Sequence, residues 1–299
     1  MTPNEYLAKV LSAQTLASNS PELKDLQERR TQVEEHLREH FDDSSPTIRY
    51  GGSKAKGTMI KESYDLDIVC YFDHDDTAAG ETLEDIYNNV RKALEGKYLV
   101  EPKSSALRLK GASADTHGAD FHIDVVPGRF TDEEEADAFL YISSGEKNRL
   151  KTNLDVHVAH VKESGVIDAI RLMKLWKVRN RLSVRNFILE LAVIKLLSSK
   201  KSATLATQLE HVWTELRDNI DDLAVEDPAN PTGNDLSDLL NAAKYELSTA
   251  AGSTLDLMAS SGWEAVFGSV EQEDRKENIA ALRRAAAVAT PTRAWCRDA

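Results

Sequence analysis

Apolar and polar positions follow three different patterns along this chain of 299 residues. In residues 20–41 the apolar positions recur at helical spacing, which predicts one long helix. Ser20 can cap its first turn and Pro21 suits that turn, because the first amides of a helix lack partners within it. The apolar stripe consists of Leu23, Leu26, Val33, Leu37 and Phe41. The polar, proline-containing stretch "DDSSPT" then ends the helical pattern.

Residues 48 to about 142 show a second pattern, in which short apolar runs are bounded by Gly, Pro, Asp and Ser. This punctuation is typical of β-strands. The runs are "TIRYGG", "LDIVCYF", "ALRLKG", "FHIDVVPG" and "AFLYIS". One helix, from Thr82 to Gly96, is predicted between the second and the third run.

After Gly145 the pattern becomes helical again. Helices are predicted over residues 166–180, 186–199, 203–220 and 236–252, followed by an alanine-rich terminal helix. The loop "DPANPTGND" (227–235) interrupts this half. A mixed segment enclosed by helical segments predicts an α+β fold with a helical second lobe. We place the boundary between residues 1–145 and 146–299.

The strongest candidate chemistry lies in "DLDIV", at the start of the second apolar run. Strand alternation puts Asp65 and Asp67 on one face, while Leu66 and Ile68 point into the core. Two carboxylates this close repel each other unless a cation lies between them. Mg²⁺ suits such a site, because proteins hold it with one or two carboxylates together with substrate phosphates.

A glycine–serine turn precedes these acids by about a dozen residues. Gly52 allows the backbone to approach a phosphate closely, and Ser53 adds a hydroxyl group. Successive amides in such a turn can form an anion-binding nest. The turn therefore predicts a phosphate subsite beside the acids.

A third acid is predicted in "DFHIDVVPG". Phe121, Ile123 and Val125 share one strand face there, which leaves Asp124 and His122 on the other. A charged residue within so apolar a strand needs a partner. Asp124 would complete a two-metal site. Asp120 shares its face and is the competing candidate, nearer to water at the start of the strand.

A lone Asp-x-Asp pair is also common at solvated strand ends, so the pair by itself leaves a structural role open. The upstream Gly52–Ser53 turn and Asp124 together favour the catalytic interpretation.

The amino-acid composition and charge limit the classes of partner that we expect for this chain. The apolar fraction of 41% and the charged fraction of 29% are ordinary for a soluble globular protein. A net charge of −13 argues against stable binding of long nucleic acid. Cys70 and Cys296 are the two cysteines, which excludes a disulfide scaffold and a Cys-rich zinc site and fits a reducing cytosol. We find neither a signal peptide nor a membrane-spanning stretch and expect a cytoplasmic protein.

The ordered set Gly52-Ser53, Gly57-Thr58, Asp65-x-Asp67 and Asp124 resembles the polymerase-β-like nucleotidyltransferase superfamily. In that superfamily the glycine–serine turn holds a triphosphate and the three acids carry two Mg²⁺ ions. The resemblance therefore implies Asp65, Asp67 and Asp124 as catalytic metal ligands, with Mn²⁺ as the alternative ion.

The second half of the chain limits the resemblance to a smaller group within this superfamily. The segments "IRLMKLWKVRN", "RNFILELAVIKLL", "DPANPTGND" and "WEAVFGS" resemble the helical lobe of oligoadenylate synthases and of bacterial cGAS/DncV-like nucleotidyltransferases, which act in antiphage signalling. The likeness covers nearly the whole chain, with the helix over 20–41 as the spine helix. It implies a polymerase-β-like core followed by a helical lobe.

Two more site residues follow from this resemblance. Lys174 matches the lysine that contacts the nucleotide triphosphate, and a snorkelling core lysine is the structural alternative. Asn186 stands where many relatives have a phosphate-binding serine; its amide can still donate. Glu190 either orients Lys174 or forms an ion pair at the lobe interface. His157 and His160 are interpreted as structural.

The implied function is template-independent transfer that joins NTPs, ATP among them, into a cyclic di- or trinucleotide second messenger. The alternatives are synthesis of linear oligonucleotides, modification of RNA, protein or a small molecule, and a non-catalytic binding or antitoxin-like module. The resemblance also makes a regulatory or conjugating protein partner and a cyclic-nucleotide-activated effector candidates for interaction.

Overall fold

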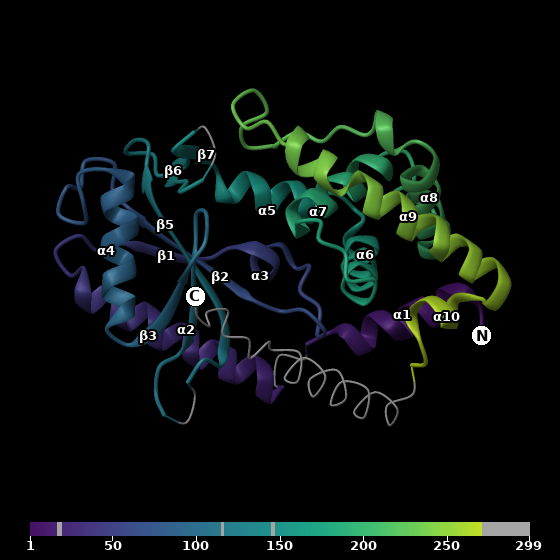
Figure 1. Cartoon of the computed structure of the whole chain (residues 1–299), viewed down its shortest axis with the longest axis horizontal. Helices are drawn as coiled ribbons and strands as arrows, with labels where there is room; N and C mark the ends of the chain where they lie inside the picture. Colours follow the sequence, from purple (N-terminus) through teal and green to yellow (C-terminus); the bar gives the residue numbers. More distant parts are fainter. Residues whose placement is uncertain (17–19, 115–116, 145–146, 271–299) are drawn as a thin grey trace, which may run out of the picture.

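The computed structural model describes residues 1–16, 20–114, 117–144 and 147–270, and the elements below lie within them. A mixed sheet organises the first half of the chain (Figure 1). Its central order is β1-β2-β5-β4-β3, and β6 continues from β5 to β7. The strands are β1 (Thr47–Tyr50), β2 (Leu66–Phe72), β3 (Tyr98–Pro102), β4 (Leu107–Gly111), β5 (Asp120–Phe130), β6 (Ala138–Tyr141) and β7 (Arg149–Thr152).

The five predicted strand runs correspond to β1, β2, β4, β5 and β6. Strands β3 and β7 were not predicted. Strand β3 pairs with β4, and β7 pairs with β6. Both are short edge strands whose burial pattern lacks a regular apolar alternation, so their pairing partners rather than their own sequences define them.

Helices α2 (Pro21–His40) and α4 (Leu83–Glu95) confirm the two helices predicted in this half. The Ser20 hydroxyl accepts a hydrogen bond from the Leu23 amide, as expected of an N-cap. Thr82 and Asp85 form a capping box at the start of α4. The apolar faces of both helices share one hydrophobic cluster with Leu66, Ile68 and other residues of the sheet.

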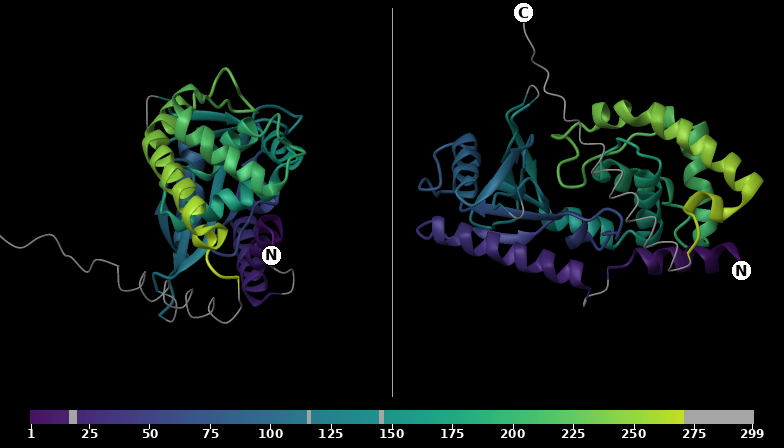
Figure 2. Two further views of the ribbon diagram at one scale, coloured as in Figure 1. Left: turned by 90° about the vertical axis from the view of Figure 1, so that its right-hand side faces the viewer. Right: turned by 60° about the horizontal axis from the view of Figure 1, so that its bottom comes forward.

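A helix that was not predicted, α1 (Pro3–Gln14), precedes them. Thr2 and Glu5 form a capping box at its start, which is the sequence signal that could have revealed it. Its buried face belongs to the hydrophobic cluster of the helical half, and Figure 2 shows α1 beside that half while α2 lies along the sheet. The boundary at residue 145 stays a prediction.

The second lobe is helical, as expected. Its elements are α5 (Leu154–Lys162), α6 (Ile167–Arg179), α7 (Asn186–Leu196), α8 (Leu205–Asp218), the 3₁₀ helix η1 (Ile220–Asp222), α9 (Ser237–Ser261) and α10 (Trp263–Phe267). Trp176 and Trp213 are fully buried at its centre. Helix α9 runs beyond the predicted end at residue 252. The predicted alanine-rich terminal helix lies outside the described residues.

Within the described ranges, no helix combines the length and the apolar character that a membrane crossing requires.

Candidate active site

Asp67 and Asp124 lie side by side on the two central strands. Strands β2 and β5 pair in parallel, with Asp67 in register with Asp124. Leu66 and Ile68 are fully buried on the opposite face, so alternation brings Asp65 and Asp67 out on one side of the sheet. The structure therefore brings the three predicted acids together, although Asp124 is 57 residues from Asp67 in sequence.

The predicted glycine–serine turn presses directly against Asp67. Its residues 52–56 form the short helix α3 (Gly52–Lys56) rather than an irregular turn. The Gly51 amide donates to the Asp67 carbonyl over 2.7 Å. Gly52 has φ of +47°, and a Cβ atom there would overlap the Asp67 carboxylate. Only glycine fits this contact, and Ser53, which is half-buried, follows it in α3.

Basic side chains surround Asp65 and Asp124. Arg108 on β4 is in register with Asp124 on β5. Its Nε lies 2.8 Å from Asp124 Oδ1, and its Nη2 lies 2.7 Å from Asp65 Oδ2. Lys103 Nζ lies 2.8 Å from Asp124 Oδ2. His122 Nδ1 lies 3.0 Å from Asp65 Oδ1. We call Asp65, Asp67, Asp120, Asp124, Lys103, Arg108 and His122 the sheet cluster.

The competing acid, Asp120, also belongs to this cluster. Its Oδ2 lies 3.5 Å from Arg108 Nη1, and its Oδ1 accepts a hydrogen bond from the His122 amide. His122 adopts a left-handed φ of +56° beside an irregularity in the pairing of β4 with β5. Backbone strain of this kind recurs at functional sites. Here it accompanies the placement of the His122 ring against Asp65.

The protonation of the acids differs with their partners. Burial alone would raise the pKa of Asp65, but the hydrogen bond from His122 and the charge of Arg108 outweigh it and lower that pKa. Burial, with the neighbouring charges of Asp124 and Asp65, raises the pKa of Asp67 to about 6. Among the described residues, no side chain or backbone group donates a hydrogen bond to the Asp67 carboxylate.

These carboxylates fit a divalent cation by their chemistry. Carboxylate oxygens are hard ligands. Burial and the negative charges of Asp124 and Asp65 raise the pKa of Asp67, and a bound cation would favour its charged form. In the part of the chain that the structure describes, no group of three or more His, Cys, Asp or Glu side chains already surrounds one point as metal ligands. Asp65 and Asp124 are instead turned towards Arg108, Lys103 and His122.

A second charged group joins the two lobes. Glu190 on α7 accepts hydrogen bonds from Lys56 Nζ over 2.9 Å and from the Thr58 hydroxyl over 2.8 Å. Lys174 Nζ on α6 lies 3.2 Å from Thr58 Oγ1 and 3.4 Å from Glu190 Oε1. All four residues are at least 93% buried. We call Lys56, Thr58, Lys174 and Glu190 the lobe-interface cluster.

Burial lowers the pKa of Lys174, against the opposing charge of Glu190. Glu190 therefore combines the two roles proposed for it as alternatives, because it contacts Lys174 and also forms an ion pair between the lobes. Lys56 was not among the site residues predicted from the sequence. A lysine between Ser53 and Gly57 in so glycine-rich a turn is the signal that could have identified it. The charges of Lys56 and Lys174 both act on Asp67, so the two clusters are adjacent.

Asn186 lies at the first position of α7 and is exposed. Its amide oxygen accepts a hydrogen bond from Lys177 Nζ over 2.7 Å. The hydrogen-bond donor of this side chain is its NH₂ group, since the amide oxygen only accepts.

His157 has a structural partner. Its Nε2 lies 2.7 Å from Asp227 Oδ1, and Asp227 also accepts from Asn234. The loop "DPANPTGND" is thereby tied to α5, which agrees with the structural interpretation of His157.

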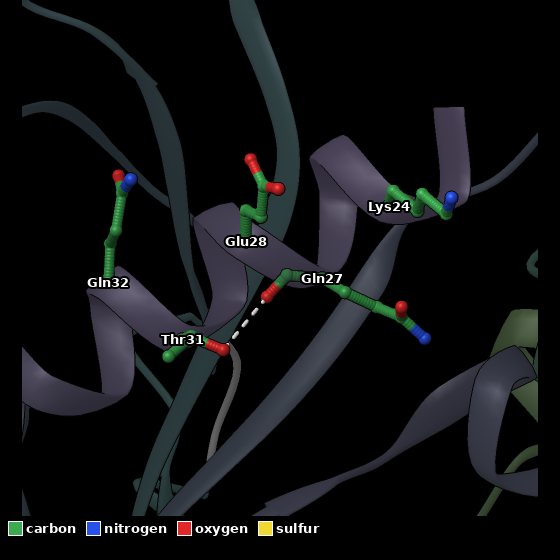
Figure 3. A pocket seen from close by; sticks show the side chains of 5 residues that line it. All are labelled: Lys24, Gln27, Glu28, Thr31 and Gln32. Atoms are coloured by element: carbon green, nitrogen blue, oxygen red, sulfur yellow. Dashed lines mark hydrogen bonds between the residues drawn. The ribbon is translucent and has the colours of Figure 1, made fainter. Parts of the chain in front are cut away.

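One pocket on the described surface lies away from the acids. It has a volume of about 440 Å³ and lies along α2, lined by Lys24, Gln27, Glu28, Thr31 and Gln32 (Figure 3). All five side chains come from one helix and spread outwards from it, and the Thr31 hydroxyl donates to the Gln27 carbonyl. It holds none of the predicted site residues.

Comparison with known proteins agrees with this architecture. Residues 1–163 match the model of the Second Messenger Oligonucleotide or Dinucleotide Synthetase domain. A cyclic AMP-AMP-AMP synthase of Escherichia coli (strain MS 115-1) is 24% identical over 292 residues, covering 80% of this chain and 88% of the synthase.

Solved structures share the fold. The E. coli MS115-1 CdnC in its HORMA-deltaN complex has a TM-score of 0.66 at 20% identity, covering 90% of this chain and 98% of that chain. The Bradyrhizobium diazoefficiens CD-NTase CdnG in complex with GTP has a TM-score of 0.66 at 16% identity, covering 94% and 99%. The predicted core and helical lobe are thereby confirmed.

Proposed function

The chain belongs to the family of Second Messenger Oligonucleotide or Dinucleotide Synthetase domains and is a nucleotidyltransferase, and we propose that it joins NTPs into a cyclic di- or trinucleotide second messenger. The observation that carries this proposal is the pairing of Asp67 with Asp124 on adjacent strands, directly under the Gly52–Ser53 segment. Acids and a phosphate-binding segment in this order are what transfer to an α-phosphate requires.

The donor nucleotide is held by its triphosphate. The Ser53 hydroxyl and the adjacent amides approach the phosphates from the sheet side, and Lys174 contributes positive charge from the helical lobe. Asn186 donates through its NH₂ group from the start of α7. Two Mg²⁺ ions, or Mn²⁺, bound by Asp65, Asp67 and Asp124 would lower the pKa of the acceptor hydroxyl and neutralise the leaving pyrophosphate.

In each transfer the acceptor hydroxyl oxygen forms a bond to the α-phosphorus, and the bond from that phosphorus to the β-phosphate oxygen breaks. Asp124 is the candidate that takes the hydroxyl proton. The other contribution of this chain is position and charge, because the site holds both reactants in line. A second transfer within the same cleft, after the linear intermediate has turned round, closes the ring.

The relatives suggest the first substrate and partner to examine. The E. coli relative is named for AMP units, so we propose ATP as one substrate. The CdnC structure contains HORMA-deltaN, so we include a regulatory protein partner in the proposal. A cyclic product would act on an effector in antiphage defence.

The proposal is tested by incubating the full chain with all four NTPs and Mg²⁺, followed by phosphatase treatment and mass spectrometry. We expect a phosphatase-resistant cyclic product that the Asp65→Asn, Asp67→Asn double variant does not form. Asp221→Asn, a change of the same kind at an exposed site, serves as the matched control.

Linear products alone would contradict cyclisation and favour the linear-oligonucleotide alternative. A cellular phenotype that survives the double variant, without any Mg²⁺-dependent product, would favour a non-catalytic module.

A further inference from the structure

Arg108 lies among three carboxylate side chains of the sheet cluster. Its guanidinium reaches Asp124 at 2.8 and 3.1 Å, Asp65 at 2.7 Å and Asp120 at 3.5 Å. The side chain is 21% exposed, so water competes weakly for these contacts. This is a bidentate, charge-assisted arrangement of the stronger kind.

The fold fixes Arg108 in this place. Arg108 and Asp124 are register partners on β4 and β5, so their Cα atoms are neighbours whatever the side chains do. Lys103, the other cation at Asp124, comes from the residues between β3 and β4, and its side chain is 34% exposed. Of these two cations, Arg108 is therefore the one anchored within the sheet.

The oxygens that Arg108 occupies are the ones that metal ligation needs. Arg108 and Lys103 together engage both oxygens of Asp124, and Arg108 and His122 engage both oxygens of Asp65. The Asp67 carboxylate, by contrast, accepts no hydrogen bond from the described residues. A cation shared by Asp65 and Asp124 would have to enter the space between them, where the guanidinium now lies.

We propose that Arg108 is a built-in competitor of the divalent cation, a positioning residue that neutralises Asp65 and Asp124 when no metal is bound and thereby sets the metal affinity. The inference rests on the proposed function, because it takes these acids as the metal ligands. Its physical basis is that a fixed guanidinium repels a divalent ion and takes up lone-pair sites of the carboxylate oxygens that the ion would use.

The test measures Mn²⁺ binding to the metal-free full chain, by titration calorimetry and by the electron paramagnetic resonance signal of free Mn²⁺. We expect Arg108→Gln to lower the Mn²⁺ dissociation constant roughly tenfold, because the competing cation is gone. Arg108→Lys keeps the charge but loses the planar fork, so its dissociation constant should lie between the two.

Lys110→Gln is the matched control, since it removes one positive charge two residues along the same strand. Lys110 pairs with Glu101, 2.5 Å away, rather than with the predicted ligands. It should change the dissociation constant by less than about twofold, because a change in general field alone is screened by salt.

A folded Arg108→Gln variant with unchanged or weaker Mn²⁺ affinity overturns the inference. Should Arg108→Gln fail to fold, Arg108→Lys decides in the same way, with a lowered dissociation constant in support and an unchanged or raised one against. Asp67→Asn separates the two hypotheses. If that variant binds Mn²⁺ like the parent chain, the metal site of the proposed function fails; if it loses Mn²⁺ while the Arg108 variants gain nothing, only the competition fails.

Discussion

The sheet cluster and the lobe-interface cluster are two concentrations of charge that the fold builds in different ways. The sheet cluster contains four carboxylates and two permanent cations and is partly exposed. The lobe-interface cluster sets two lysines against one glutamate and is almost completely buried. One therefore has surplus negative charge and the other surplus positive charge.

The two surpluses are complementary to a metal–triphosphate group. The acids would attract the metal ions, and the lysines would attract the phosphates. The positive charges of Lys56 and Lys174 also partly offset the rise in the pKa of Asp67, which couples the two clusters. The clusters differ in what holds them. Neighbouring strands fix the sheet cluster by register, whereas the docking of one lobe on the other fixes the lobe-interface cluster.

The largest effect is expected when the lobe-interface cluster loses its only carboxylate. Glu190→Gln leaves two buried ammonium groups without their paired carboxylate and should lower the free energy of unfolding by about 3–5 kcal/mol. Lys56→Met should lower it less, because one lysine–glutamate pair survives. Denaturant unfolding at constant salt measures both variants.

Glu264→Gln, at an exposed glutamate, is the control and should stay within about 0.5 kcal/mol of the parent chain. An equal loss for Lys56→Met and Glu190→Gln would contradict the charge surplus inferred for this cluster.

A change in pH should have an intermediate effect on the free energy of unfolding of the metal-free chain, through the sheet cluster. The pKa of Asp67 is raised to about 6 in the folded chain, above its unfolded value, so the folded state binds more protons between the two. The free energy of unfolding should therefore fall by about 2 kcal/mol as the pH rises from about 4 to 6.5.

Unfolding curves in EDTA across this range check the prediction, with Asp67→Asn as the comparison. The difference between parent and variant isolates Asp67, because the other titrating groups are common to both. A parent–variant difference that does not change with pH would show that Asp67 is not an unneutralised carboxylate.

The smallest effect is expected at Asn186, which belongs to neither cluster. Asn186→Ala removes the donor NH₂ group and should raise the KM for the donor NTP by about threefold, with kcat nearly unchanged. Asn186→Ser, which introduces the residue that the family resemblance implies at this position, should stay within about twofold of the parent. Steady-state kinetics measures both, and a large fall in kcat with Asn186→Ala would assign this residue to the transition state instead.

Much of the site could be predicted because it depends on local periodicity. Asp65 and Asp67 share a face through strand alternation alone, and the apolar stripe from Leu23 to Phe41 is enough to define α2. The family resemblance added Lys174. The glycine-rich turn is a weak local signal for Lys56, which Lys54 shares, and no local rule identifies Arg108, since isolated basic residues in such segments are usually solvated.

The sequence by itself determined most of the strands and helices, and which acids can meet on one face of β2. Only the tertiary structure decided what those acids touch. The bond between Arg108 and Asp124 follows from the pairing of β4 with β5, and the burial of Glu190 with two lysines follows from the contact between lobes. The physical reason is that charge is neutralised through space, between groups that can be far apart in the chain and close together in the fold.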